Sequence, residues 1–283
     1  MNILMIGAHA DDCDILASGL ALKYVRDGHC VRFLAMTDGS AGHHILNRAD
    51  TAARRLAETQ EVSKLTGIAY DVWDVPDGQL MPDLATRERL IRYIRNFAPD
   101  VVFCHRPNDY HPDHRNSGLL VQDASYMLIV PNCVPDAPAL KRSPVIMFME
   151  DRFSNPPFRA DVVIDVDDVV EDKFRILDKH VSQFYEWLPY TRGQLETVPD
   201  DPAARFDWLH RDYVTHDTTD AQLLAGDMKG YAVRFSLPAA KHRAELIERY
   251  GERGRTIRFA EAYEVSEYGA PLTKELREKL FPY

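Results

Sequence analysis

Histidine and aspartate residues gather in two short segments of the sequence, each directly after an apolar run. The first segment, AHADD at positions 8–12, follows the run at 2–7. The second, at positions 105–114, ends in HPDH and follows the run at 101–104. Imidazole nitrogens and carboxylate oxygens are ligands that zinc takes in proteins. The residue types in these two segments therefore indicate a site for a divalent cation.

Three of these side chains can form a metal site with one vacant position. His9 and Asp12 are three residues apart on one turn, so both can reach a single ion. His114 lies on the second segment and would supply the third ligand. Two nitrogens and one oxygen with an open fourth position are typical of catalytic zinc, because water occupies the vacancy. His111 would stand beside the metal without binding it.

Each of these residues also has a simpler interpretation. Asp12 alone fits a helix N-cap, and His9 alone fits a hydrogen-bonded loop residue. Asp11 alone would compensate the dipole of a helix that starts at this turn. The occurrence of both motifs at strand exits of one sheet favours the metal site.

Strands and helices alternate through the first half of the chain. Apolar runs predict strands at 2–7, 31–36, 71–75 and 101–104, and helical spacing predicts helices at about 15–25, 54–65, 84–97 and 119–128. Such alternation is typical of a parallel sheet with right-handed crossovers. Both chemical segments would then lie at the carboxyl edge of the sheet, where ligand sites form in α/β folds.

The second half of the sequence is less regular. It predicts strands at 145–149, 162–166 and 259–265 and helices at 169–184 and 240–250, with a loop-rich stretch at about 187–235. We expect a single domain over residues 1–283, with a core at 1–185 and a C-terminal extension at 186–283. The extension would form a lid or an oligomer contact.

The composition is that of a globular protein and limits the classes of partner. Of the 283 residues, 45% are hydrophobic and 28% charged, and the net charge of −10 argues against binding nucleic acid. The sequence shows neither an apolar stretch of about 18 residues nor a signal-peptide pattern at its start. Its 4 scattered cysteines fit reduced thiols. We expect a cytoplasmic protein that binds neither nucleic acid nor membrane.

The order of these motifs resembles that of the PIG-L/LmbE-like zinc-dependent N-deacetylases. AHADD is similar to the AHPDD signature of that family, and NDYHPDH at 108–114 is similar to its second motif. Weaker likenesses are RLAE at 55–58, PDG at 76–78, Lys173 with HVSQ at 180–183, and EAY at 261–263. The positions that depart from the family pattern, none of them a ligand, are Ala10, Asp14 and Ser18.

The resemblance implies a fold and a metal. The fold would be an α/β, Rossmann-like three-layer sandwich with a mostly parallel sheet and a smaller irregular C-terminal part. One zinc ion per chain would be held by His9, Asp12 and His114.

The resemblance also implies roles for the remaining polar residues. Asp11 would act as general base toward the attacking water, and His111, oriented by Asp113, would be the second proton-transfer group. The residues expected to contact the substrate are Arg55, Asp77 and Asp109. Without the resemblance, Arg55 equally fits an ion pair on an exposed helix face, and Asp77 equally fits a turn residue.

The implied activity is zinc-dependent N-deacetylation. The substrate would be an N-acetylglucosamine-type sugar or glycoconjugate, and the products acetate and a free amine. Two alternatives stay open: a zinc amidase acting on a thiol-conjugate or an antibiotic-like glycoside, and a non-catalytic sugar-binding protein of Rossmann-like fold. No GxGxxG follows the first strand, so dinucleotide binding is not indicated. Similar bacterial enzymes are often trimers or hexamers, so we expect a homo-oligomer.

Overall fold

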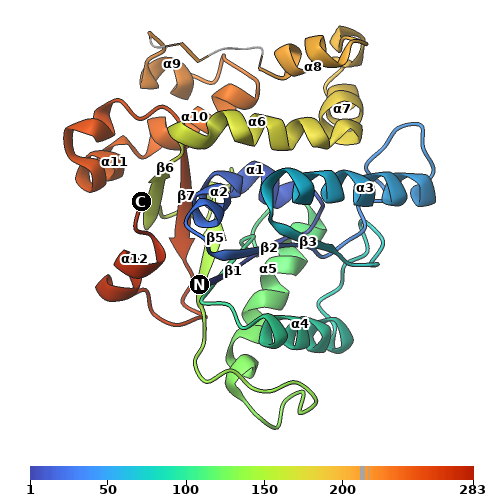
Figure 1. Ribbon diagram of the computed structural model, residues 1–283, viewed down its shortest axis with the longest axis vertical. Coiled ribbons are helices and arrows are strands. Elements are labelled where there is room, and N and C mark those ends of the chain that lie inside the picture. Colours follow the sequence, from blue (N-terminus) through green and yellow to red (C-terminus); the bar gives the residue numbers. More distant parts are fainter. Residues whose placement is uncertain (211–213, 216) are drawn as a thin grey trace.

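A central sheet of seven strands runs through the protein, whose computed structural model describes residues 1–210, 214–215 and 217–283 (Figure 1). Its strands are β1 (Asn2–Gly7), β2 (Cys30–Ala35), β3 (Ala69–Val72), β4 (Val101–Cys104), β5 (Val145–Met149), β6 (Val162–Asp165) and β7 (Ala260–Val265). They are ordered β3-β2-β1-β4-β5-β7-β6. The first five strands pair in parallel, whereas β7 is antiparallel to both β5 and β6. The mostly parallel sheet predicted from the sequence is confirmed.

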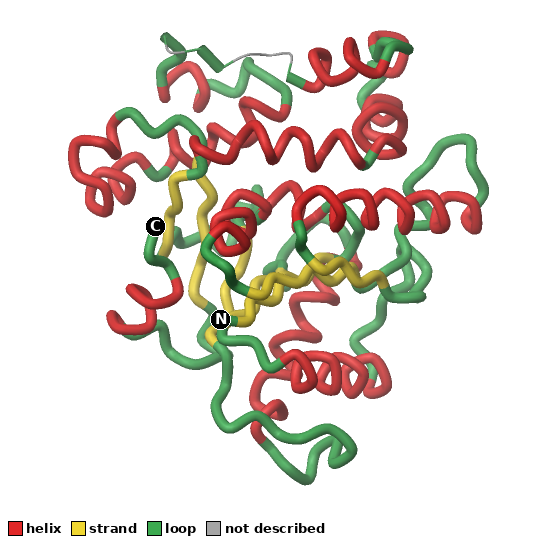
Figure 2. Tube along the Cα trace, viewed as in Figure 1, coloured by secondary structure: helices red, strands yellow, loops and turns green. Residues whose placement is uncertain are grey.

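Helices cover both faces of the sheet, which gives the predicted three layers. The helices are α1 (Asp12–Leu16), α2 (Ser18–Arg26), α3 (Arg48–Thr66), α4 (Leu84–Phe97), α5 (Pro112–Ser125), α6 (Val170–Lys179), α7 (Leu188–Thr191), α8 (Pro202–Leu209), α9 (Asp220–Leu224), α10 (Tyr231–Lys241), α11 (Arg243–Tyr250) and α12 (Lys274–Leu280). In Figure 1, α1, α2, α3 and α6 lie on one side of the sheet and α4 and α5 on the other. Figure 2 shows the strands between these layers of helix.

Alternate residues of β1 pack into two separate hydrophobic cores, one on each face of the sheet. Ile3 and Met5 pack in one core together with Leu20 of α2. Leu4 packs in the other core together with Leu90 of α4. A strand that is buried on both faces reads as a continuous apolar run, which is how β1 appears in the sequence.

Two helices begin earlier than hydrophobic spacing predicts. α5 begins at Pro112 rather than near residue 119, because proline is favoured in the first turn and the side chain of His111 caps the helix. α3 begins at Arg48 rather than near residue 54, because the side chain of Asn47 accepts a hydrogen bond from the amide of Asp50 at 3.0 Å. Capping side chains set both starts, and the first of them places His111 at a helix N-terminus.

The stretch at about 187–235, predicted to be loop-rich, contains loops but also short helices. This stretch holds α7, α8, α9 and the start of α10. Pro189 and Pro202 lie in the first turns of α7 and α8, where a proline costs no helical hydrogen bond. Prolines that suggest interruptions in the sequence therefore begin helices in the structure. Residues 211–213 and 216 of this stretch lie outside the described residues.

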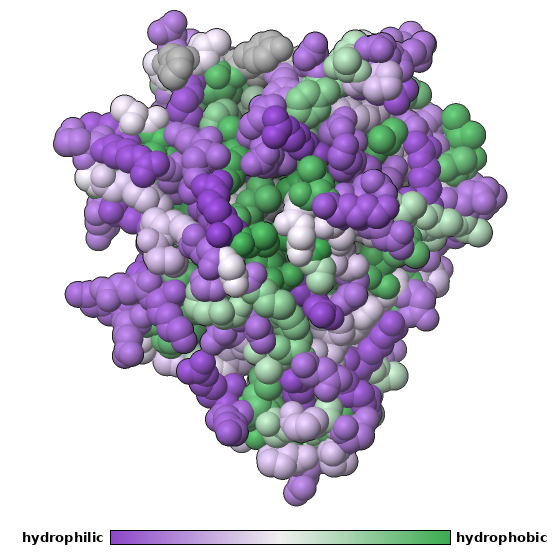
Figure 3. Space-filling view, in the orientation of Figure 1, coloured by the Kyte–Doolittle hydropathy of each residue, from purple (hydrophilic) through white to green (hydrophobic). Residues whose placement is uncertain are grey.

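The surface mixes polar and apolar side chains. Hydrophilic side chains cover much of the face shown in Figure 3, with apolar patches between them. Exposed apolar residues such as Ile45, Tyr126 and Tyr268 come from distant parts of the chain. None of the described helices combines the length and the apolar character that crossing a bilayer requires.

A buried ion pair ties α6 to β7. Lys173 and Glu261 are 1% and 4% exposed, and the ammonium group of Lys173 contacts the Glu261 carboxylate. Glu261 also accepts hydrogen bonds from the amides of Gly19 and Leu20, both at 2.8 Å. These amides belong to the first turn of α2, where a negative charge is favoured. The late motifs around Lys173 and Glu261 therefore support the helix that follows the AHADD segment.

We expect the substitution Lys173→Met to lower the free energy of unfolding by about 3–5 kcal/mol, because it leaves a buried carboxylate without its cation. Urea titration followed by circular dichroism measures the change. The matched control is Lys64→Met, since Lys64 pairs with Glu61 at 2.6 Å on the exposed surface of α3 and should contribute little. Equal, small changes in both variants would contradict a supporting role for the buried pair.

Candidate metal centre and active site

The two chemical segments meet because β1 and β4 are parallel neighbours, so the loops that leave them start at the same edge of the sheet. Gly7 makes the first turn tight, since a Cβ at this position would lie 2.7 Å from the Cβ of Asp12. Asp12 is fixed within that turn. Its Oδ2 accepts hydrogen bonds from the amides of Ala8 at 2.9 Å and His9 at 2.8 Å. The backbone thus holds this carboxylate toward the second segment.

The three predicted ligands lie within coordinating reach of one another. Nδ1 of His9 lies 3.1 Å from Nε2 of His114. The Asp12 carboxylate lies 3.6 Å from His9 through Oδ2 and 3.3 Å from His114 through Oδ1. A tetrahedral zinc ion with ligands at about 2.0–2.1 Å would separate those ligands by about 3.4 Å. The three distances, of which two are measured to different oxygens of the Asp12 carboxylate, are close to this separation.

Carboxylates face the outer nitrogens of both histidines. Nε2 of His9 lies 3.2 Å from Asp77 and 3.4 Å from Asp113. Nδ1 of His114 lies 3.0 Å from Asp109. Metal-binding histidines typically donate their second N–H to such carboxylates. With protons on the outer nitrogens, the inner nitrogens point lone pairs at each other beside a carboxylate, and this donor set fits a cation.

The local charges favour the same conclusion. Burial opposes protonation of His9, but hydrogen bonds with Asp113 and Asp12 raise its pKa well above the usual value. Burial likewise opposes ionisation of Asp12, but His114 and His105 hold its pKa well below the usual range. The site therefore stabilises positive charge at the position where the three donor atoms converge.

His105 belongs to the same cluster, and the spacing of the motifs does not reveal it. Its Nε2 lies 3.1 Å from Oδ2 of Asp12, and its ring stacks on that of His114 with centroids 4.1 Å apart. His105 is 3% exposed. Asp12, His105 and His114 form one group of donors that could hold an ion. The one signal in the sequence is that His105 directly follows β4.

Asp11 points away from the metal triangle and pairs with Arg55. Nη2 of Arg55 donates to Oδ1 of Asp11 at 2.8 Å, and Nη1 donates to the carbonyl of Gly39 at 3.2 Å. Arg55 is 2% exposed, so this pair is held in one arrangement by its surroundings. In the described part of the chain, no hydrogen bond engages Oδ2 of Asp11. That oxygen is free to accept a proton from a group in the adjoining pocket.

His111 and Asp113 stand at the start of α5. The amide of Asp113 donates to Nδ1 of His111 at 3.2 Å, so a neutral His111 carries its proton on Nε2. The Asp113 carboxylate accepts from the amides of Gly78 at 2.7 Å and Leu80 at 3.2 Å. Asp113 therefore orients His111 through its backbone amide. The carboxylate of Asp113 instead lies beside Nε2 of His9. Burial, together with the positive charge of His9, lowers the pKa of His111.

Two weaker motifs of the sequence bind each other behind the site. The amide and hydroxyl of Ser182 donate to the Glu58 carboxylate at 2.8 and 2.6 Å. Gln183 donates to the carbonyl of Gly42 at 3.1 Å. The RLAE and HVSQ motifs thus connect α3 to the segment after α6, and Glu58 accepts hydrogen bonds from Ser182 rather than forming an exposed pair with Arg55.

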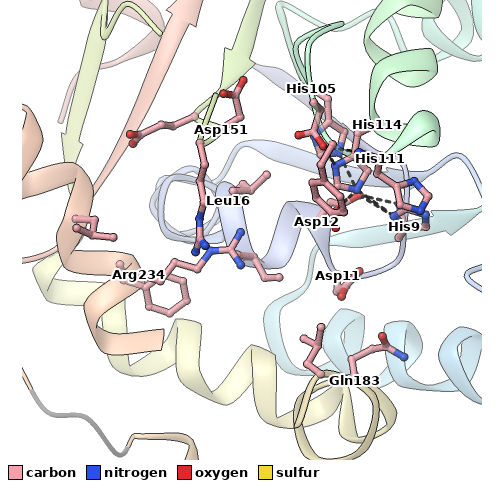
Figure 4. A pocket seen from close by; sticks show the side chains of 18 of the residues that line it. His9, Asp11, Asp12, Leu16, His105, His111, His114, Asp151, Gln183 and Arg234 are labelled. Atoms are coloured by element: carbon pink, nitrogen blue, oxygen red, sulfur yellow. Dashed lines mark hydrogen bonds and ion pairs between the residues drawn. The ribbon is translucent and has the colours of Figure 1, made fainter. Parts of the chain in front are cut away.

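The metal triangle borders a cavity of about 710 Å³. All of the residues predicted to contact substrate line this cavity, and these are Arg55, Asp77 and Asp109. Each of them also contacts a side chain that is predicted to bind the metal or transfer protons, and their contact with substrate stays a prediction. Figure 4 shows the histidines on one side of the cavity, with Asp11 and Gln183 below them and Arg234 on the opposite side.

Comparison with protein families and curated proteins gives the following similarities. Residues 4–125 match the family model PIG-L, described as GlcNAc-PI de-N-acetylase. A diacetylchitobiose deacetylase from Thermococcus kodakarensis is 29% identical to this chain over 207 residues, which cover 68% of the chain and 75% of that protein. The residues of this chain that match the family model include both chemical segments, at 8–12 and 105–114.

Two solved structures share the fold over almost the whole chain. An N,N′-diacetylchitobiose deacetylase from Pyrococcus horikoshii superposes with a TM-score of 0.64 at 22% identity, covering 94% of this chain and 84% of its own. A 4-carboxy-2-hydroxymuconate hydratase from Pseudomonas putida superposes with a TM-score of 0.65 at 18% identity, covering 93% and 95%. The likeness extends beyond β4 and includes the C-terminal part.

Proposed function

We propose that this chain, whose residues 4–125 match the PIG-L family model, hydrolyses the acetamide group of an N-acetylglucosamine-type sugar or glycoconjugate to acetate and a free amine. The observation that carries this proposal is the triangle formed by His9, Asp12 and His114, which borders a cavity together with Asp11. A metal site with an open position beside an acid–base residue is what amide hydrolysis by water requires.

One zinc ion per chain is the proposed cofactor, held by His9, Asp12 and His114. When bound there, zinc supplies a Lewis acid that activates water and polarises the acyl oxygen. The chain contributes the orientation of its ligands: Asp77 and Asp109 fix the outer nitrogens of the two histidines.

Asp11 is the proposed general base. Its Oδ1 is engaged by Arg55 at 2.8 Å, which fixes the carboxylate and leaves Oδ2 to take a proton from the attacking water. Arg55 therefore acts as a positioning residue in this proposal. The same carboxyl group can then return the proton to the amine that leaves, because an unprotonated amine is a poor leaving group.

His111 is the proposed hydrogen-bond donor to the acyl oxygen. The amide of Asp113 occupies Nδ1, so the proton of neutral His111 resides on Nε2. A donor at this position stabilises the negative charge that develops on oxygen during attack. A pKa below the usual value keeps His111 in this neutral, donating form at neutral pH.

The test is acetate release by purified, zinc-loaded protein from N-acetylglucosamine, its chitobiose dimer, an inositol-linked form and an acetylated glycopeptide antibiotic. We expect release from at least one sugar, an at least about 10³-fold loss after chelation, and recovery when zinc is restored. Release only from the antibiotic would favour the amidase alternative. The same fold also occurs in a hydratase, so the fold alone does not fix the reaction. Sugar binding without acetate release would contradict the proposed deacetylation.

A homo-oligomer, such as a trimer or hexamer, and a cytoplasmic location remain predictions. Analytical ultracentrifugation of the purified chain tests the first. A single sedimenting species at the mass of one chain would contradict it.

A further inference from the structure

The lining of the cavity beside the proposed metal centre includes arginines that no carboxylate neutralises in the described part of the chain. The cationic side chains that line it are Arg55, Arg152, Lys173, Arg192, Arg234 and Lys241. Half of these have a carboxylate partner: Arg55 pairs with Asp11, Lys173 with Glu261, and Lys241 with Glu150. Within residues 1–210, 214–215 and 217–283, no carboxylate lies within ion-pair distance of Arg152, Arg192 or Arg234.

Arg234 is half-buried, whereas Arg152 and Arg192, the other two arginines without a carboxylate partner, are exposed. It projects from α10 into the cavity, on the side opposite the histidine cluster, with Leu16 between them (Figure 4). Its guanidinium makes no hydrogen bond to the described residues. Burial lowers the pKa of Arg234, and the positive charges of Arg152 and Arg192 lower it further. Arg234 is half-buried, and an anion bound between it and the like charges of Arg152 and Arg192 would relieve their repulsion.

The carboxylates nearest to this side of the cavity are already engaged. Both oxygens of Asp151 accept hydrogen bonds from Arg106, at 2.5 and 2.7 Å. Glu150 pairs with Lys241 at 2.8 Å. Oε2 of Glu150 has no hydrogen-bond partner among the described residues, but neither carboxylate lies within ion-pair distance of Arg234. Among the described residues, no carboxylate serves as counter-ion to Arg234, so this position can take an anion bound from outside the chain.

We propose that Arg152 and Arg234, with Arg192 beside them, form a subsite for an oxyanion carried by the substrate, either a carboxylate or a phosphate. The planar guanidinium group binds both kinds of anion through paired N–H donors. The subsite shares one cavity with the metal triangle, so one molecule can place its acetamide at the metal and its anion at the arginines. This inference rests on the proposed function, because it assigns the anion to the deacetylated substrate.

Direct binding tests the subsite without requiring catalysis. Isothermal titration of the zinc-loaded protein with inorganic phosphate and with succinate gives the dissociation constants. We expect Arg234→Gln and Arg152→Gln to weaken binding of at least one probe by about 10-fold or more. Arg234→Lys, which keeps the charge, should retain part of the affinity.

The matched control is Arg142→Gln, because Arg142 is an exposed arginine that pairs with Asp100 at 3.0 Å outside the cavity. It should bind both probes as the unaltered protein does. Melting temperatures of all variants check that they fold. Unchanged binding of both probes by folded Arg234→Gln and Arg152→Gln would overturn the subsite.

Turnover then separates the two proposals. Acetate release is compared for N-acetylglucosamine, its 6-phosphate and its lactyl ether, which carries a carboxylate. We expect kcat/KM to favour an anionic sugar over the neutral one by about 10-fold or more, and Arg234→Gln to reduce that ratio by a similar factor. Arginine-dependent anion binding without acetate release would reject the deacetylase and keep the subsite. Acetate release without any arginine-dependent preference for anionic sugars or binding of anions would keep the deacetylase and reject the subsite.

Discussion

The substitution Asp11→Asn is expected to lower kcat by about 10²–10⁴-fold while leaving the zinc content of the protein unchanged. Asparagine keeps the size of the side chain and an oxygen that can accept from Arg55, whose Nη2 lies 2.8 Å from Oδ1. It cannot take a proton from water. Asp11 lies outside the triangle of His9, Asp12 and His114, so the metal should remain bound.

Two measurements on each preparation test this expectation. Metal analysis by mass spectrometry gives the zinc content, and acetate release from the best substrate gives kcat. Asp74→Asn is the matched control, because Asp74 is an exposed aspartate that also pairs with an arginine, Arg89, at 2.7 Å. A variant Asp11→Asn that turns over normally, or that loses zinc, would remove Asp11 from its proposed role.

The second large effect is expected for His114→Ala, which should lose both zinc and activity. His114 supplies one of the three donor atoms, and its removal also leaves Asp109 without the imidazole that it contacts at 3.0 Å. Loss of one of three ligands should weaken zinc binding by orders of magnitude, because the ion then keeps two protein ligands. The thermal stabilisation that zinc gives the unaltered protein should also disappear.

Dialysis against a weak chelator, followed by metal analysis and thermal melting with and without added zinc, measures this loss. His111→Ala is the matched control, since His111 lies beside the triangle and is proposed to act on the substrate. It should keep its zinc and its zinc-dependent melting shift while losing activity. Equal zinc contents in His114→Ala and His111→Ala would contradict the assignment of the ligands.

The sequence predicts the metal triangle because two simple signals coincide. Apolar runs mark β1 and β4, and the polar residues that follow them must share an edge if the strands are parallel. The HxxD and HPDH spacings then select His9, Asp12 and His114. His105 carries no spacing signal, although it lies 3.1 Å from Asp12, because stacking on another ring leaves no periodic pattern.

The side of the cavity opposite the metal could not be predicted from the sequence. Arg152 follows β5 and Arg234 lies on α10, so only the fold brings them to one cavity. The stretch that leads to α10 reads as loop in the sequence, because the prolines at the starts of α7 and α8 resemble helix breakers. Periodicity predicts the layers around the sheet well, whereas it says little about which distant charged side chains face each other.

The order of the strands constrains when the site can assemble during translation. Among the described strands, β6 pairs with β7 alone, and β7 is synthesised after the other six strands. Before β7 is synthesised, β6 has no strand to pair with and Lys173 lacks its ion-pair partner Glu261. A nascent chain that ends after α5 already carries every proposed zinc ligand but none of the unpaired arginines. Metal capture can therefore precede the completion of the substrate cavity during synthesis.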